Sequence, residues 1–241
     1  MIWGYRIGSG VSTPLPIRLD VDSHCNGLLV GSSGSGKSYA LAYLLGCLLQ
    51  DTPEIDLFFI DFKNSSEFQF MQGFHHYYAG NDSYQGVMDY YKKFCERRVS
   101  GEKGKRALMI FDEYPAAVSY WSMLDKQNKT KYANDMMGAI AEILMLGRGL
   151  AFGVWIVSQR ADASLFLNGA RDNFMVVLGL GRISREQKGM LFAGEDIPDK
   201  VYHTGEGILL ADGFPLYEVV IPRIKNLVDW KKHIKAVLCK N

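Results

Sequence analysis

The chain has 241 residues, of which 48% are hydrophobic and 12% aromatic, so it is long enough and apolar enough to bury one large core. Its 27 Lys and Arg residues nearly balance 26 Asp and Glu residues, which excludes a general electrostatic attraction to nucleic acid or to an anionic membrane. We therefore expect one domain over residues 1–241, with any binding of charged partners confined to local sites.

Short runs rich in Val, Ile, Leu and Phe alternate along the chain with stretches of helical period, which is typical of parallel strands buried on both faces. The expected strands are 27–30, 55–60, 107–111, 151–157, 174–180, 207–211 and 215–221. The expected helices are 37–50, 84–98, 132–148, 185–192 and 227–238.

Two segments refine this pattern. Asp212 and Gly213 form a turn signal between the last two strands, which predicts an antiparallel hairpin. The polar segment 122–131 has no periodic apolar face, so we expect a mobile loop there. The sequence thus predicts an α/β fold with a mainly parallel central sheet, flanking helices and an antiparallel extension near the C-terminus.

Residues 28–45, LLVGSSGSGKSYALAYLL, place a glycine- and serine-rich turn between an apolar run and a helical stretch. The turn fits G-x-x-x-x-G-K-[ST], in which backbone N–H groups wrap phosphates and the positive end of the next helix faces them. We expect Lys37 to reach the outer phosphates and Ser38 to hold Mg²⁺. The alternative, a glycine-rich turn with an incidental Lys, is disfavoured by the order of strand, turn and helix. The expected nucleotide-binding residues are Gly31, Ser32, Ser33, Gly34, Ser35, Gly36, Lys37, Ser38 and Tyr39.

The stretch ALMIFDEYPA reads as a buried strand that ends in Asp112 and Glu113, at the edge where a parallel sheet binds ligands. We expect Asp112 to orient Mg²⁺ through its water shell and Glu113 to polarise a water for attack on the γ-phosphate. Two acids that merely end a strand are the alternative. The stretch NKTK ends in Lys131 where a guanine-specific loop needs a carboxylate, so we expect ATP rather than GTP.

In GRGLAFGVWIVSQRAD, residues 147–162, a helix end carrying Arg148 leads into a buried strand that ends at Gln159. A polar Gln at that strand tip can contact both water and γ-phosphate, so we expect Gln159 to act as a sensor. Arg148 lies at the opposite end of the strand, which suits an arginine finger that serves a neighbouring subunit. The alternative for Arg148 is a cation favoured by the helix dipole.

Five stretches, in this order, resemble the FtsK/SpoIIIE branch of the FtsK and HerA superfamily of RecA-like P-loop ATPases. They are LLVGSSGSGKS, FFIDFKNSSEF, LMIFDEYPA, LGRGLAFGVWIVSQR and GEGILLADG, within roughly residues 13–215. The resemblance assigns Lys37, Ser38, Asp112, Glu113 and Gln159 to the nucleotide site and Arg148 to the finger in trans. It also implies that Asp61 and Lys63 lie beside that site, although a local ion pair at a strand end explains them equally well.

The resemblance further implies a hexameric ring that uses ATP and Mg²⁺ to move DNA through a central pore, as in segregation or conjugative transfer. The membrane anchor and the winged helix that usually accompany such motors are not recognisable here, so we expect no direct membrane insertion. A ring concentrates a few cations from each subunit, which allows a nearly neutral chain to hold DNA of either strandedness. The candidate DNA contacts, for which ordinary surface cations are the alternative, are Lys126, Lys129, Arg160 and Arg171.

A second function remains open at this point. In it the chain is an ATP-dependent coupling or assembly module of a DNA-transfer or phage export machine, and nucleotide controls oligomerisation and the binding of a relaxase or secretion channel. The four cysteines form no C-x-x-C pair, which argues against a zinc site or a disulfide framework. Neither a bilayer-spanning run nor a signal segment is recognisable, so we expect a cytoplasmic location.

Overall fold

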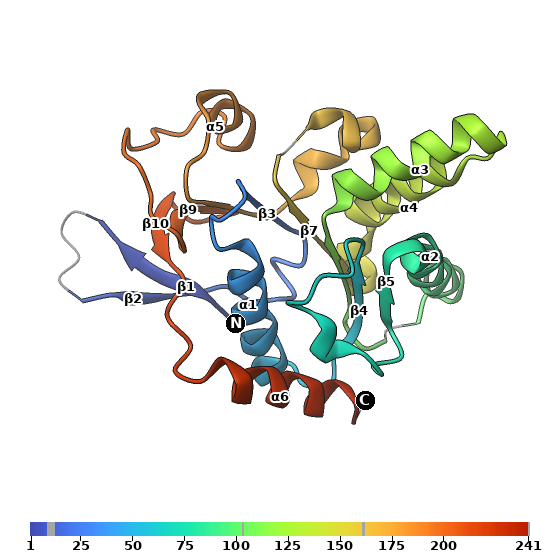
Figure 1. The fold of residues 1–241 in the computed structure, drawn as a ribbon, viewed down its shortest axis with the longest axis horizontal. Coiled ribbons are helices and arrows are strands. Elements are labelled where there is room, and N and C mark those ends of the chain that lie inside the picture. Colours follow the sequence, from blue (N-terminus) through green and yellow to red (C-terminus); the bar gives the residue numbers. More distant parts are fainter. Residues whose placement is uncertain (9–12, 103, 161, 241) are drawn as a thin grey trace.

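The computed structural model describes residues 1–8, 13–102, 104–160 and 162–240. These residues form a ten-stranded sheet in the order β2-β1-β10-β9-β8-β3-β7-β6-β4-β5 (Figure 1). The strands are β1 Ile2–Ile7, β2 Leu15–Arg18, β3 Gly27–Gly31, β4 Asp56–Asp61, β5 Tyr77–Ala79, β6 Ala107–Asp112, β7 Phe152–Ser158, β8 Val176–Leu180, β9 Glu206–Ala211 and β10 Tyr217–Val220. The α-helices are α1 Lys37–Asp51, α2 Ser83–Ser100, α3 Tyr114–Asn128, α4 Tyr132–Leu146, α5 Arg185–Leu191 and α6 Leu227–Leu238.

The sheet has a parallel part and an antiparallel part. Strands β8, β3, β7, β6, β4 and β5 are parallel neighbours, so their carboxyl ends lie at one edge. Strands β9, β10, β1 and β2 continue the sheet in antiparallel pairs. The predicted α/β class, mainly parallel sheet and C-terminal antiparallel extension are therefore confirmed, and the strands β1 and β2 lengthen that extension from the other end of the chain.

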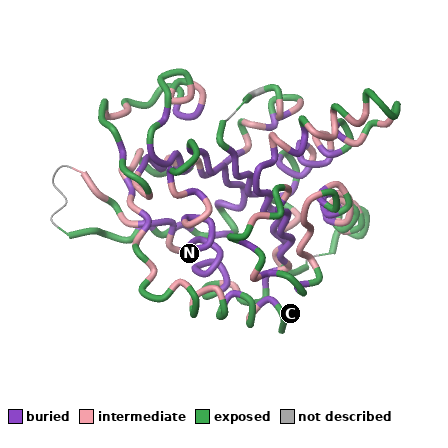
Figure 2. The backbone as a smooth tube through the Cα atoms, in the orientation of Figure 1, coloured by how far each residue is buried: buried purple, intermediate pink, exposed green. Residues whose placement is uncertain are grey.

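Helices cover both faces of the sheet and separate its core into two parts. On β4, Leu57 and Phe59 point to the face packed by α1 and α6, whereas Phe58 and Ile60 point to the face packed by α2, α3 and α4. This alternation follows from the two-residue period of a strand. The sheet and the inner side of α1 are accordingly buried, and the outer helices expose their far sides (Figure 2).

Asn26, directly before β3, joins the middle of this sheet to the helical layer and so fixes where β3 begins. Its side chain is fully buried and donates to the carbonyl oxygens of Leu144 and Asn173, each at 3.1 Å. Its Oδ1 accepts from the N–H of Val154 on β7 at 3.1 Å. Because every polar atom of the amide is used, its burial is compatible with a stable core.

The expectation of a loop over residues 122–131 is wrong, because α3 continues to Asn128. The Asp125 carboxylate accepts from the hydroxyl of Thr130 at 2.6 Å and from the N–H groups of Tyr132 and Ala133, each at 2.9 Å. Asp125 therefore satisfies the first N–H groups of α4 and ties the two helices together. Because this link between the two helices is polar, the segment carries no periodic apolar face from which a helix could be predicted.

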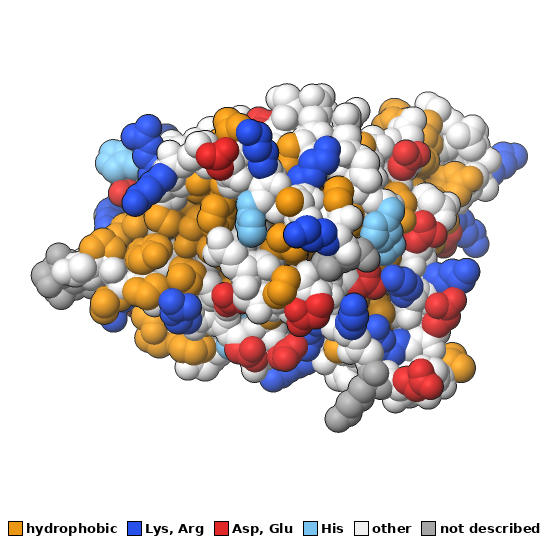
Figure 3. All heavy atoms as spheres, turned by 90° about the horizontal axis from the view of Figure 1, so that it is seen from below, with side chains coloured by type: hydrophobic (Ala, Val, Ile, Leu, Met, Phe, Trp, Pro, Cys, Tyr) orange, Lys and Arg blue, Asp and Glu red, His pale blue; other side chains and the backbone are white. Residues whose placement is uncertain are grey.

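The molecular surface carries mixed charges. On the face seen in Figure 3, Lys, Arg, Asp and Glu side chains are intermingled, and hydrophobic side chains gather beside the β1–β2 hairpin, where Leu15 is 57% exposed. Among the described residues, no helix is both long enough and apolar enough to cross a lipid bilayer.

Candidate nucleotide site

The phosphate loop, residues 31–36, connects the buried end of β3 to the start of α1. Gly34 and Gly36 have φ values of 78° and 94°, a region that residues with a Cβ rarely adopt. At Gly31 a Cβ would lie 2.7 Å from the carbonyl oxygen of Leu180, so the loop needs glycine there too. Helix α1 begins with no side-chain cap and no acidic residue in its first turn, so its positive end is available to an anion.

Lys37 and Ser38 are the first residues of α1. Lys37 is 8% exposed, and its ammonium donates to the carbonyl oxygens of Gly31 at 2.6 Å and Ser32 at 3.1 Å. Burial lowers the pKa of Lys37, while the carboxylates of Glu113 and Asp112 act in the opposite direction. The ammonium thus already lies within the loop that is expected to wrap the phosphates.

Neighbouring strand ends bring the predicted acids and Gln159 to the same edge. In the sheet, β3 is followed by β7, β6 and β4, so Gln159, Asp112 and Asp61 lie next to the phosphate loop in that order. Gln159 and Asp112 line a cavity of about 370 Å³ whose wall also includes Ser33, Gly34, Gly36, Lys37, Ser38, Tyr39, Lys63, Ser65, Glu67 and Glu113. The structure therefore brings together most of the residues that were predicted for nucleotide binding. Tyr39 is only partly available, because its hydroxyl accepts a hydrogen bond from the N–H of Ile224.

The acids at this edge are electrostatically crowded. Burial, together with the charges of Glu113 and Asp61, raises the pKa of Asp112 to about 7, although Lys63 and Lys37 act against this rise. Asp61 is fully buried and its Oδ1 has no hydrogen-bond partner. A divalent cation relieves such crowding and prefers oxygen ligands. The residues therefore fit a Mg²⁺ ion held by Ser38 and Asp112, where it would neutralise phosphate charge.

Glu113 is held by groups from two neighbouring strands. It precedes α3 with a φ of 60°, and its N–H donates to the carbonyl oxygen of Val157 at 3.0 Å. Its Oε1 accepts from the ammonium of Lys63 at 2.8 Å and from the side-chain amide of Gln159 at 3.1 Å. One carboxylate oxygen therefore joins the ends of β4, β6 and β7.

The phosphate loop is supported by a segment that the sequence analysis did not assign to the site. The hydroxyl of Thr204 donates to the carbonyl oxygen of Gly34 at 3.1 Å, and the N–H of Gly205 donates to that of Ser35 at 2.9 Å. Gly205 has a φ of 82°, which suits glycine. The signal in the sequence was the pair of glycines in TGEG, residues 204–207, where β9 begins.

Arg148 lies far from this cavity, as predicted. It is exposed in the 3₁₀ turn Gly147–Leu150 before β7, whereas Gln159 follows the end of β7. Seven strand residues separate the two ends, a distance of about 20 Å at the usual rise per residue. Arg148 lines another cavity, of about 1380 Å³, together with Arg106 and the acids Asp20, Asp22 and Asp51.

The four candidate DNA contacts lie on different elements. Lys126 and Lys129 are exposed at the outer end of α3, which projects from the body of the molecule beside α4 (Figure 1). Arg160 and Arg171 lie between β7 and β8, and Arg160 borders a cavity of about 510 Å³ next to Ser32 and Ser33. These positions do not form one basic cluster within a single subunit.

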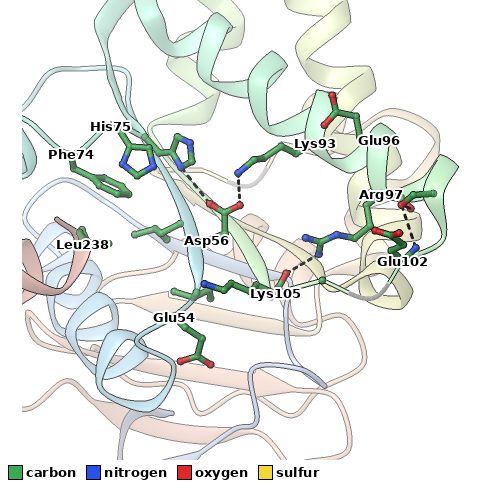
Figure 4. A pocket seen from close by; sticks show the side chains of 15 residues that line it. Glu54, Asp56, Phe74, His75, Lys93, Glu96, Arg97, Glu102, Lys105 and Leu238 are labelled. Atoms are coloured by element: carbon green, nitrogen blue, oxygen red, sulfur yellow. Dashed lines mark hydrogen bonds and ion pairs between the residues drawn. The ribbon is translucent and has the colours of Figure 1, made fainter. Parts of the chain in front are cut away.

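A further cavity of about 500 Å³ lies where β4 begins, at the edge opposite the phosphate loop (Figure 4). Asp56 accepts from the ammonium of Lys93 at 2.6 Å and lies 3.4 Å from Nδ1 of His76. Burial alone would raise the pKa of Asp56, but the nearby imidazole of His76 and the ammonium of Lys93 outweigh it and lower the pKa to about 2. Its central charges are paired with one another, and this cavity has no part in the candidate nucleotide site.

Comparison with known proteins supports the same assignment. A model of the FtsK/SpoIIIE family matches residues 7–101, which contain the phosphate loop. The FtsK domain-containing protein YdcQ of Bacillus subtilis (strain 168) is 28% identical over 138 residues, which are 56% of this chain and 27% of that protein. The chain therefore spans only about a quarter of the length of this curated relative.

Two solved structures have the same fold. The conjugation coupling protein TcpA of pCW3, in a monomer form with ATPγS, has a TM-score of 0.69 and 19% identity over 97% of this chain and 70% of that one. The cytoplasmic domain of the type VII secretion ATPase EccC of Thermomonospora curvata has a TM-score of 0.65 and 21% identity over 99% of this chain and 30% of that one. The resemblance to FtsK/SpoIIIE-type proteins is thus confirmed, and the chain has the RecA-like P-loop ATPase fold of that family.

Proposed function

We propose that this chain is an ATP-hydrolysing motor domain. It assembles into a hexameric ring and moves DNA through the centre of that ring. The observation that carries the enzymatic part is Glu113, a carboxylate directly after Asp112 that contacts Gln159 and lines the same cavity as Lys37. A chain that only switches with bound nucleotide has no need for a water-polarising acid at this position.

Within one subunit, the phosphate loop and the end of α1 would bind the phosphates, and Lys37 would neutralise charge on the outer ones. Ser38 and Asp112 would hold Mg²⁺, and Glu113 would take a proton from the attacking water. Gln159 lies beside Glu113 and is suited to sense whether the outer phosphate is present.

The proposal of a ring is supported by the position of Arg148. The residue is exposed at the edge opposite the nucleotide cavity, so it is suited to reach the site of the next subunit in a head-to-tail arrangement. In such a ring, Lys126 and Lys129 at the outer end of the projecting α3, or Arg160 and Arg171, would contact phosphates of DNA without reading its sequence.

A second candidate function is favoured by the fold relatives, which include a conjugation coupling protein and a type VII secretion ATPase. In it, nucleotide controls assembly and the binding of a protein partner, such as a relaxase or a secretion channel, and DNA is not what moves. The residues of the nucleotide site are compatible with both functions.

The rate of ATP hydrolysis, measured with double-stranded DNA, with single-stranded DNA and without DNA over a range of protein concentrations, separates these functions. We expect one DNA form to raise the rate, and the rate per subunit to increase cooperatively with concentration as rings assemble. A rate that ignores both DNA forms would favour the partner-binding module. A protein that binds Mg²⁺·ATP without turnover at any concentration would exclude the motor.

A further inference from the structure

The proposed function gives no role to Lys63, yet the ammonium of this residue contacts Glu113, the expected general base. Its ammonium lies 2.8 Å from Oε1 of Glu113, and the two side chains are 46% and 12% exposed. The same oxygen accepts from Gln159 at 3.1 Å. An oxygen that already accepts from an ammonium and an amide is poorly placed to accept a proton from water.

The backbone that carries Lys63 is fixed by its neighbours. The Asp61 carboxylate accepts from the N–H of Ser65 at 2.8 Å and from the hydroxyl of Tyr77 at 3.0 Å, and the N–H of Asn64 donates to the Asp61 carbonyl at 3.1 Å. These bonds close a tight turn after β4, in which Asn64 has a φ of 51°. Lys63 is thus presented toward Glu113 from a rigid turn, unlike a lysine on an open surface.

A second contact links this turn to the helix that follows Glu113. The ring of Phe62 packs against Tyr120 of α3 with centroids 5.6 Å apart. The turn after β4 and the start of α3 are therefore joined both by packing and by the ion pair. Both Lys63 and Glu113 line the cavity that also contains Lys37 and Ser38, so a bound triphosphate would meet the pair directly.

We propose that Lys63 is a positioning residue that clamps Glu113 against Gln159, and that binding of a nucleoside triphosphate at the phosphate loop opens this clamp. The inference rests on the proposed function, because it takes Glu113 to be the general base of the proposed ATPase site and Lys63 to restrain it. The negative γ-phosphate takes the Gln159 amide and repels the Glu113 carboxylate, so Glu113 leaves the Lys63 ammonium and is then free to accept a proton from water. A diphosphate, which lacks the γ-phosphate, leaves the clamp closed.

The test is the affinity for Mg²⁺·ATPγS and for Mg²⁺·ADP of the wild type, Lys63→Met, Glu113→Gln and the double variant. If the clamp must open, Lys63→Met binds ATPγS about fivefold more tightly in the wild-type background, a change that corresponds to about 1 kcal/mol for an ion pair of this exposure. In the Glu113→Gln background the same substitution gives no gain. ADP affinity changes less than about twofold, and Lys63→Arg, which keeps the ion pair, stays at the wild-type value.

Simple attraction between Lys63 and phosphates predicts the opposite sign, because removal of a cation would weaken ATPγS binding in both backgrounds. That result, or an equal gain in both backgrounds, would overturn the clamp. Lys93→Met is the matched control, since Lys93 pairs with Asp56 at 2.6 Å, is 44% exposed and lies at the opposite edge of the sheet. A wild type that fails to bind Mg²⁺·ATPγS would instead refute the proposed nucleotide site, and a wild type that binds without hydrolysis would refute the motor and leave the clamp testable.

Discussion

Glu113 combines two features at the residue scale, a left-handed backbone and a carboxylate that is buried among polar partners. Its φ of 60° turns the chain from β6 into α3, which places the side chain over the nucleotide cavity and between the ends of β4 and β7. Non-glycine residues in this region are uncommon and often serve a site. The sequence motif identified Glu113, but its contact with Lys63 depends on a turn whose shape the motif does not report.

Replacement of Glu113 by Gln preserves the size of the side chain and removes its negative charge. We expect ATP hydrolysis to fall at least about 100-fold while Mg²⁺·ATPγS still binds, because a general base contributes about 10²- to 10⁴-fold to such reactions. Phosphate release and ligand affinity are measured side by side. Glu67→Gln is the control, since Glu67 lines the same cavity. A comparable loss in both variants would contradict the role of Glu113 as the base.

Asp112 gives a prediction about pH. Its pKa rises from 3.8 to about 7 because of burial and the neighbouring acids, so between these values the folded protein holds a proton that the unfolded chain has released. Stability should therefore fall as pH rises through this window, and Asp112→Asn should remove the fall. Relative to the wild type, the gain in unfolding free energy from Asp112→Asn should be about 2 kcal/mol larger at pH 8 than at pH 5. Urea unfolding without Mg²⁺ measures it, and an equal gain from the exposed Asp212→Asn would refute this cause.

At the scale of elements, the sequence was most informative where burial is continuous. Strands β3, β4, β6 and β7 and helix α1 were predicted to within one or two residues, because their apolar runs and the glycine loop have unambiguous periods. The site follows from these strands, since parallel neighbours bring Asp61, Asp112 and Gln159 to one edge. Strands β1, β2 and β5 and helix α3 were missed. Strands β2 and β5 are short edge strands, β1 has an irregular register between Ile2 and Gly4, and α3 is held by polar contacts, so all four have weak sequence patterns.

Helix α3 and helix α4 share one polar link that should be measurable. Asp125→Ala removes the acceptor of the N–H groups of Tyr132 and Ala133, which begin α4. We expect a loss of about 1 to 2 kcal/mol in unfolding free energy, the usual effect of losing a helix N-cap. Asp125→Asn, which keeps an acceptor oxygen, should lose less. A stability equal to that of the wild type for Asp125→Ala would show that α4 does not depend on this contact.

At the scale of the whole molecule, the nucleotide cavity and Arg148 lie at opposite edges of the parallel strands. A subunit with this arrangement carries a phosphate loop on one side and an exposed guanidinium on the other, so a head-to-tail contact would complete one site from two chains. The mixed surface charges and the net charge of +1 argue that any hold on DNA comes from repetition of a few cations around a ring.

Arg148→Ala should therefore abolish hydrolysis in a ring made only of the variant, with a loss of about 10³-fold or more if the arginine stabilises the transition state in trans. Mixing it with Lys37→Ala subunits, which cannot use their own nucleotide but still carry Arg148, should restore part of the activity, because some Arg148→Ala sites then receive an intact arginine from a neighbour. The recovered rate should rise and fall with the mixing ratio, as random assembly requires. Arg18→Ala, an exposed arginine on the edge strand β2, serves as the control and should keep wild-type activity. Mixtures that stay inactive at every ratio, although the two variants assemble together, would mean that Arg148 acts only within its own chain.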